Sequence, residues 1–162
     1  MSSVFEYAKY FIKQNLDNNR QTFDGNMKLQ TLLTFANLIS LAEYDKPLFD
    51  DDILALENGC VIEDVYFCYE NDCAGFVADS QSFDPNFSRE ECDVLNITTA
   101  LLGSVPAQEL SEISHTFDFW KNTFEKSVQT NDNHAAVVSI GDMRKEVDRV
   151  RDAIYAVRVS QQ

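Results

Sequence analysis

The chain has 162 residues, of which 44% are hydrophobic and 25% are charged. This length and composition are typical of one globular domain and exclude a collagen-like, linker-rich or globally disordered chain. Twenty-seven acidic residues against 13 basic residues give a formal net charge of −14, which disfavours direct binding to nucleic acid or to an anionic membrane. The charge is uneven, because 15 acids and two bases lie between Glu43 and Asp93.

The sequence shows no signal for a membrane or for export. No apolar run reaches the roughly 20 residues that a membrane-spanning helix needs. The stretch MSSVFEYAKYFIKQ lacks the basic segment, apolar run and cleavage site of a secretory signal. We therefore expect a cytoplasmic protein with free cysteine thiols. No Cys-x-x-Cys pair is present, and His115 and His134 add no zinc-ligand spacing, so we expect neither a metal nor a cofactor.

Apolar residues at helical spacing predict a first helix over residues 3–17. The strongest helical signal follows at residues 26–44, where apolar residues occupy nearly every side. The polar residues recur every three positions and drift around the helix, so they form no continuous polar face. A helix that is apolar nearly all round is buried. We therefore place residues 26–44 at the centre of the fold, and Pro47 ends this run.

The segment from residue 53 to residue 87 has a less regular pattern. Residues 53–56 are compatible with a short strand or with an irregular crossing, and the pattern leaves both open. Apolar steps of three and four predict a short helix over residues 61–69. Residues 70–87 are polar and contain turn-forming residues, which predicts a loop. A small β-hairpin around residues 74–78 is an option within that loop.

Helical signals return after residue 87. Ser88 and Glu91 have the spacing of a capping box, which predicts the start of a helix that Gly103 closes. Pro106 opens the next helix, and residues 115–118 turn the chain.

The sequence after residue 118 contains a group of large aromatic residues and then predicts a loop and a final helix. Phe119, Trp120 and Phe124 are either core residues or an interface anchor. Residues 127–136 have the composition of a mobile loop. Residues 142–158 carry a narrow apolar stripe at 4-3-4-3 spacing, which predicts one amphipathic helix that docks on this domain or on a partner.

These elements together predict a mostly α protein. We expect a single compact multi-helix domain over residues 1–162, built around the buried helix at about 26–44. A small β-hairpin or short strands are expected between residues 53 and 80.

Four short segments carry a recognisable residue order. They are NMKLQTLLTFA at residues 26–36, KPLFDDDI at 46–53, NGCVIEDVY at 58–66, and LSEISHT at 110–116 followed by Trp120 and Lys121. These segments resemble the patterns N-M-K-L-Q-K-L-L-Y-Y-A, K-P-L-F-D-E-x-I, Y-G-P-V-V-P-x-V-Y and L-S-x-L-(S/T)-H…P-W-K of the Panacea domain, the family that includes the SocA-like antitoxins. Cys60 and Glu63 depart from the pattern, since the family usually has proline at both places.

The resemblance implies a mostly helical, non-enzymatic protein that neutralises a toxin encoded nearby by direct protein contact. Some members occur in prophages, and at least one group acts as a proteolytic adaptor that hands its toxin to a protease. The alternative is therefore an adaptor or prophage regulator that binds host proteins, a protease ATPase among them, through its acidic surface. The motif positions expected to contact a partner or to support its surface are Met27, Lys28, Leu29, Gln30, Pro47, Leu48, Asp50, Asp51, Asp52, Gly59, Val61, Tyr66, Leu110, Ser111, His115 and Trp120.

Two of these groups have a chemical alternative. Ser111 and His115 lie four residues apart with Asp118 nearby, which is the residue set of a nucleophile, its base and an orienting acid. No glycine-flanked nucleophile turn accompanies them, so we expect structural roles. The triplet Asp50–Asp52 has carboxylates of the type that bind Mg²⁺ or Ca²⁺. It lacks the spacing of a calcium loop, and a solvated acidic loop is the expected role.

Overall fold

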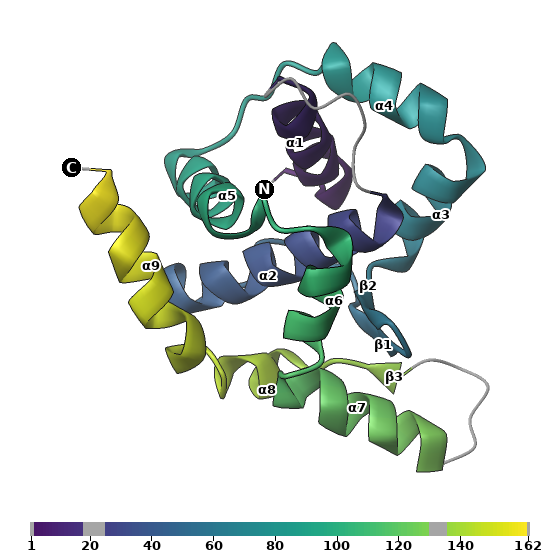
Figure 1. Ribbon diagram of the computed structural model, residues 1–162, viewed down its shortest axis with the longest axis vertical. Helices are drawn as coiled ribbons and strands as arrows, with labels where there is room; N and C mark the ends of the chain where they lie inside the picture. The colour runs from purple at the N-terminus through teal and green to yellow at the C-terminus, as the bar shows by residue number, and fades with distance from the viewer. Residues whose placement is uncertain (1, 18–24, 130–135, 162) are drawn as a thin grey trace.

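The computed structural model describes residues 2–17, 25–129 and 136–161, and it confirms the mostly α architecture (Figure 1). The helices are α1 (Val4–Asp17), α2 (Asn26–Tyr44), α3 (Glu63–Asn71), α4 (Cys73–Gln81), α5 (Arg89–Leu102), α6 (Ala107–Ser114), α7 (Asp118–Gln129), α8 (Ile140–Arg144) and α9 (Asp148–Ser160). The strands are β1 (Leu54–Leu56), β2 (Gly59–Val61) and β3 (Ala136–Val137).

Helix α2 runs through the middle of the molecule, and most other elements pack around it (Figure 1). Fifteen of its 19 residues are buried, as the sequence predicts. Leu29, Leu33 and Leu38 are fully buried, and burying a leucine side chain contributes about 1.5–3 kcal/mol relative to leaving it in water. The helix ends at Tyr44 because Asp45 takes a left-handed conformation with φ +55°. The core of the fold is therefore organised along α2.

The small sheet forms next to the N-terminal end of α2. Its strand order is β2-β1-β3 with antiparallel pairing, and Leu54 pairs with Val61 on one side and with Val137 on the other. The open choice at residues 53–56 is thereby decided in favour of a strand. The predicted helix over residues 61–69 is wrong at its start, because Val61 belongs to β2 and α3 begins at Glu63. The hairpin lies at residues 54–61 and not at 74–78.

The predicted loop over residues 70–87 is also wrong in part, since residues 73–81 form α4. The Asp72 side chain caps this helix by accepting a hydrogen bond from the Gly75 N–H at 3.1 Å. Phe76 and Ser80 are buried, and α4 packs along α1. Tertiary packing stabilises this short helix, whose own sequence carries only a weak helical pattern.

The predicted helix over residues 142–158 is two helices, α8 and α9, separated by a turn at residues 145–147. The break follows from Glu146, whose buried carboxylate accepts hydrogen bonds from the backbone N–H groups of Asp118 (2.8 Å) and Phe119 (2.7 Å). These N–H groups open α7 and would otherwise be unpaired. The apolar stripe still faces inward, and α9 packs against α5 and α2.

Two further predictions concern the edges of elements. The capping box of α5 is confirmed, with Ser88 and Glu91 each bonded to the other's backbone. The predicted loop over residues 127–136 is wrong at both ends, because α7 continues to Gln129 and β3 begins at Ala136. Residues 130–135, with His134, lie outside the described residues. None of the helices seen in the described ranges is long and apolar enough to span a membrane.

Candidate functional site

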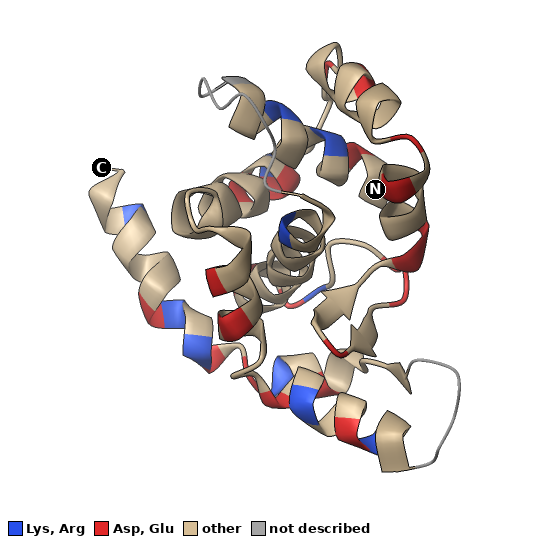
Figure 2. Ribbon diagram, turned by 45° about the vertical axis from the view of Figure 1, so that its right-hand side comes forward, with Lys and Arg blue, Asp and Glu red and all other residues tan. Residues whose placement is uncertain are grey.

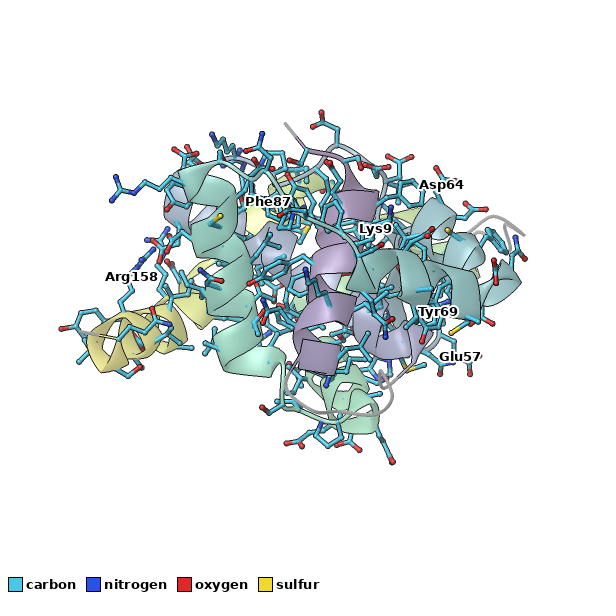
Figure 3. The ribbon with its side chains drawn as sticks, turned by 90° about the horizontal axis from the view of Figure 1, so that it is seen from above. Lys9, Glu57, Asp64, Tyr69, Phe87 and Arg158 are labelled. Atoms are coloured by element: carbon cyan, nitrogen blue, oxygen red, sulfur yellow. The ribbon has the colours of Figure 1, made fainter. Side chains whose placement is uncertain are left out.

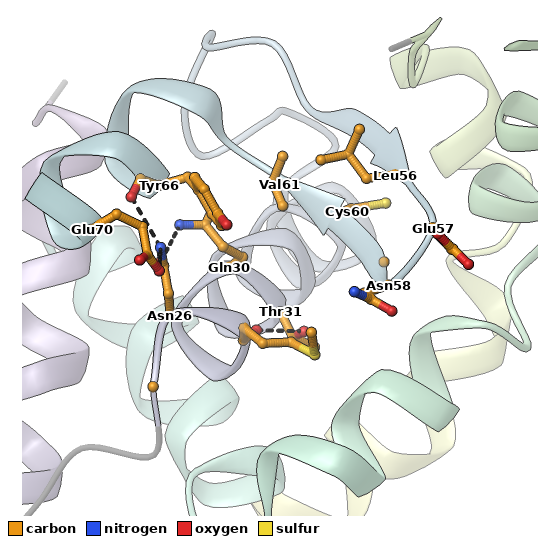
Figure 4. A pocket seen from close by; sticks show the side chains of 13 residues that line it. Asn26, Gln30, Thr31, Leu56, Glu57, Asn58, Cys60, Val61, Tyr66 and Glu70 are labelled. Atoms are coloured by element: carbon orange, nitrogen blue, oxygen red, sulfur yellow. Dashed lines mark hydrogen bonds between the residues drawn. The ribbon is translucent and has the colours of Figure 1, made fainter.

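Two of the four motif segments meet at a groove near the N-terminal end of α2 (Figure 4). The groove lies between the first turn of α2, the β1–β2 hairpin and α3, and its volume is about 580 Å³. The motif positions that line it are Met27, Gln30, Gly59, Val61 and Tyr66. The first and third motif segments, which are separated in sequence, therefore form one surface.

Two side-chain amides hold the groove together. Gln30 is buried, and its Nε2 donates to Asn26 Oδ1 at 2.9 Å while its Oε1 accepts from the Ile62 N–H at 2.8 Å. Asn26 Nδ2 donates to the carbonyl oxygen of Tyr66 at 2.9 Å and to Glu70 Oε1 at 3.0 Å. Through these bonds α2 is joined to the end of β2 and to α3, so the walls of the groove are fixed relative to one another.

The hairpin turn depends on Gly59. Its φ is +134°, whereas Glu57 and Asn58 at the centre of the turn have no positive φ. A Cβ at position 59 would lie 3.9 Å from Ser114 Cβ, an ordinary van der Waals contact, so the requirement for glycine is conformational and not steric. Gly59 is therefore a motif residue because of its backbone.

The fourth motif segment holds this turn in place from the other side. Three successive backbone carbonyl oxygens of the hairpin each accept a hydrogen bond from a motif side chain. The pairs are Ser111 Oγ with Asn58 (2.9 Å), His115 Nε2 with Glu57 (3.1 Å) and Trp120 Nε1 with Leu56 (2.7 Å). The imidazole also lies against the indole, with ring centroids 4.2 Å apart. We call these three side chains the turn clamp.

The turn clamp uses the groups that a hydrolase would need. The Ser111 hydroxyl and the His115 Nε2–H are both donated to the hairpin backbone, and not to each other. The backbone N–H of Asp118 belongs to the cap formed by Glu146. Ser111 and His115 thus hold α6 against the hairpin, and the Asp118 N–H ties the start of α7 to Glu146.

The acidic triplet lies away from the groove. Asp50, Asp51 and Asp52 are exposed and line a shallow hollow of about 110 Å³ together with Val138 and Ile140. Across the residues that the structure describes, no three His, Cys, Asp or Glu side chains are grouped as metal ligands would be. The four cysteines carry free thiols.

The remaining motif positions belong to the interior or its edge. Leu29, Leu48 and Leu110 are core residues, and Pro47 lies at the edge of the hollow beside the acidic triplet. Lys28 is buried, and its Nζ donates to the carbonyl oxygen of Gly103 at 2.8 Å. This bond ties α2 to the end of α5, so Lys28 has a structural role.

Eight residues that line the groove were not among the candidate site positions, namely Gly25, Asn26, Thr31, Leu56, Glu57, Asn58, Cys60 and Glu70. The Asn58-Gly59 pair was the available signal, because such pairs mark turns. Burial raises the pKa of the Cys60 thiol to about 12, so the thiol stays protonated at neutral pH and is a poor nucleophile. The groove thus offers shape and charge and no activated nucleophile from this cysteine.

The charge around the groove is negative. Glu57 and Glu70 line it, and no Lys or Arg does so among the described residues. The chain has ten acids and no base between Lys46 and Arg89. Figure 2 shows acidic residues along the side that carries the hairpin, α3 and α4, whereas acidic and basic residues alternate on α7, α8 and α9.

The fold and the groove define a helical protein whose motif residues build a surface. The family described as "Antitoxin SocA-like, Panacea domain" matches residues 29–121, more than half of the chain. The chain therefore belongs to this family, as its motif segments indicate. The match begins within α2 and ends in α7. It includes the turn clamp and the groove residues from Gln30 to Glu70, whereas Gly25, Asn26 and Met27 precede it. Neither a curated protein nor a solved structure matches the chain.

Proposed function

We propose that this protein is a non-enzymatic antitoxin that acts in the cytoplasm by binding a protein toxin encoded nearby. Membership of the SocA-like family supports an antitoxin-type function. The observation that carries the proposal is the turn clamp. Its hydroxyl, imidazole and indole groups all donate hydrogen bonds to backbone carbonyl oxygens of the hairpin. These motif residues therefore shape a surface and assemble no reactive centre.

The charge of the chain supports a basic partner. A net charge of −14 concentrated between Glu43 and Asp93 attracts proteins with positive clefts, and toxins that act on RNA or nucleotides often present such clefts. Electrostatic attraction of this kind raises the association rate and makes it fall with added salt.

We also propose that residues 1–162 form a single Panacea-like domain in which α8 and α9 are part of the folded unit. The contacts of α9 with α5 and α2 support this arrangement. An antitoxin of this kind would present its groove and acidic side on a preformed scaffold.

Co-expression with the product of the adjacent open reading frame tests the function. We expect that product to arrest growth alone, and to be harmless and to co-purify with this protein when both are made. No rescue and no complex would contradict the proposal. Co-purification of a protease ATPase, without any toxic neighbour, would replace it with the adaptor alternative.

The acidic triplet provides a sharper version of that experiment. Replacing Asp50, Asp51 and Asp52 by lysine should slow association with the toxin by about tenfold or more, because it removes the attraction near one edge of the acidic side. A matched control replaces three exposed acids of α6 and α7 by lysine, namely Glu109, Glu112 and Glu125. Both variants change the net charge equally, so equal effects would show that only the overall charge matters.

A further inference from the structure

We infer that the groove beside the β1–β2 hairpin binds an extended segment of the partner protein, in which one large apolar side chain is flanked by Lys or Arg. The inference deepens the proposed function and rests on it, because it takes the partner to be a protein. It assigns the contact to the groove and specifies the chemistry of the bound segment.

The groove exposes apolar side chains that the fold does not use. Met27 is 37% exposed and Leu56 is 38% exposed, although both are large hydrophobic residues. Val61 and Tyr66 are half-buried and line the same groove. A large apolar side chain of a partner would remove all four from water on entering the groove.

The ends of the groove determine which flanking residues are favoured. Figure 4 shows Glu70 beside Tyr66 at one end and Glu57 beside Leu56 at the other. No Lys or Arg lines the groove among the described residues, and the exposed acids Glu63 and Asp64 follow it on α3. An apolar centre with an acid at each end is complementary to an apolar residue with basic neighbours on both sides.

The strand next to the groove favours an extended segment. β2 is at the edge of the described sheet, since the order is β2-β1-β3, and its residues 59–61 line the groove. A strand edge can accept an extended chain alongside it. The Gln30 amide and the turn clamp fix the groove before binding, so little ordering of the protein is needed on association.

Peptide selection on the whole chain tests the inference without requiring the toxin. Random peptides displayed on phage would be selected on the immobilised wild-type protein. We expect the recovered sequences to contain one large apolar residue with Lys or Arg on both sides. Synthetic copies of the selected peptides should bind the wild-type protein more weakly as salt is added. Measured by fluorescence anisotropy, their affinity for Met27→Glu and for Leu56→Glu should be about tenfold lower than for the wild type.

Two controls distinguish a loss of peptide binding from a loss of folding. An acid at position 27 suits the first turn of a helix, so Met27→Glu should fold even if Leu56→Glu does not. Tyr155→Glu changes another exposed side chain, 71% accessible on α9, and should bind as the wild type does. Figure 3 shows Arg158 of α9 at the opposite end of the molecule from Glu57 and Asp64.

Several outcomes would overturn the inference. These are no recovered peptides, equal binding of peptides without Lys or Arg, wild-type affinity in both groove variants, or a dimer in solution that Met27→Glu dissociates. The last result would assign the groove to a second copy. Growth rescue that persists in both groove variants would contradict binding of the toxin in the groove, but it would be consistent with the antitoxin function. Failed rescue by the wild-type protein together with groove-dependent peptide binding would contradict the antitoxin function, but it would support the groove as a peptide-binding site.

Discussion

At the scale of single residues, buried polar side chains on α2 decide the shape of the candidate site. Gln30 is the clearest example, because one amide joins α2 to the N–H of Ile62 and to Asn26. Of the side-chain polar atoms buried in the described residues, none lacks a hydrogen-bond partner. Such a network specifies the structure strongly, and each member becomes costly to remove.

Gln30→Leu should therefore destabilise the protein by about 1–3 kcal/mol, because it leaves the buried Ile62 N–H without its acceptor. Urea unfolding measures the difference. Thr31→Val is the matched control, since the Thr31 hydroxyl bonds only the Met27 carbonyl of its own helix and its loss separates no elements. A control as damaging as Gln30→Leu would contradict the proposed bridging role.

The cysteines give a second prediction at this scale. Cys60 is buried and burial raises the pKa of its thiol to about 12, whereas Cys73 and Cys92 are exposed. Alkylation with iodoacetamide near pH 8 should modify the two exposed cysteines first and Cys60 only when the protein unfolds, because the thiolate is the reactive form. Peptide mass spectrometry after timed quenching measures the order. Early modification of Cys60 in folded protein would show that the groove opens more than the structure indicates.

At the scale of elements, helix ends are tied to distant segments by carboxylates. Glu91 closes the capping box of α5 and also accepts a 2.5 Å hydrogen bond from the Tyr7 hydroxyl of α1. Glu146, in the turn between α8 and α9, accepts hydrogen bonds from the first two N–H groups of α7. In both cases one carboxylate caps the start of a helix and joins that helix to a segment far away in the sequence.

Glu91 predicts a pH dependence of stability. Burial by itself would raise its pKa, but hydrogen bonds from Tyr7 and Ser88 lower it from 4.5 to about 2. A carboxyl whose pKa is lower in the folded state stabilises the protein above the unfolded pKa. That contribution is lost as the pH falls from about 4.5 towards 2. The wild-type protein should be more stable than Glu91→Gln near pH 7. This difference in the free energy of unfolding should become smaller as the pH falls from about 4.5 towards 2. Urea midpoints across pH measure it, and a constant gap would contradict the assignment.

At the scale of the whole molecule, the C-terminal helix is held by charge as well as by its apolar stripe. Arg158 on α9 pairs with Asp93 of α5 at 2.7 Å and with Glu43 of α2 at 3.4 Å. Burial of Val150, Ile154 and Val157 supplies the apolar part. Arg158 thus offsets part of the negative charge carried by residues 43–93.

Arg158→Met should loosen α9 without unfolding the core. Partly exposed ion pairs contribute about 0.2–1 kcal/mol each, so we expect faster amide hydrogen exchange in α9 and unchanged exchange in α2. Arg151→Met is the matched control, because Arg151 pairs with Asp148 of its own helix. Equal acceleration in both variants would mean that the interhelical pairs do not hold α9.

The sequence determined the features that depend on neighbouring residues. The bounds of α2, its burial and the capping box of α5 follow from apolar spacing and from side chains three positions apart, and the structure has all three. The motif segments also indicated the family. These signals are local, so no knowledge of the fold is needed to use them.

The tertiary structure alone decided the features that depend on distant partners. Helix α4 exists because α1 covers it, and the break at residues 145–147 exists because Glu146 reaches the start of α7. The roles of Ser111, His115 and Trp120 became visible only when the hairpin carbonyls lay within 3.1 Å of them. Hydrogen bonds to backbone atoms leave no pattern in the acceptor residues, because every residue has a carbonyl. The groove could therefore be found only in three dimensions.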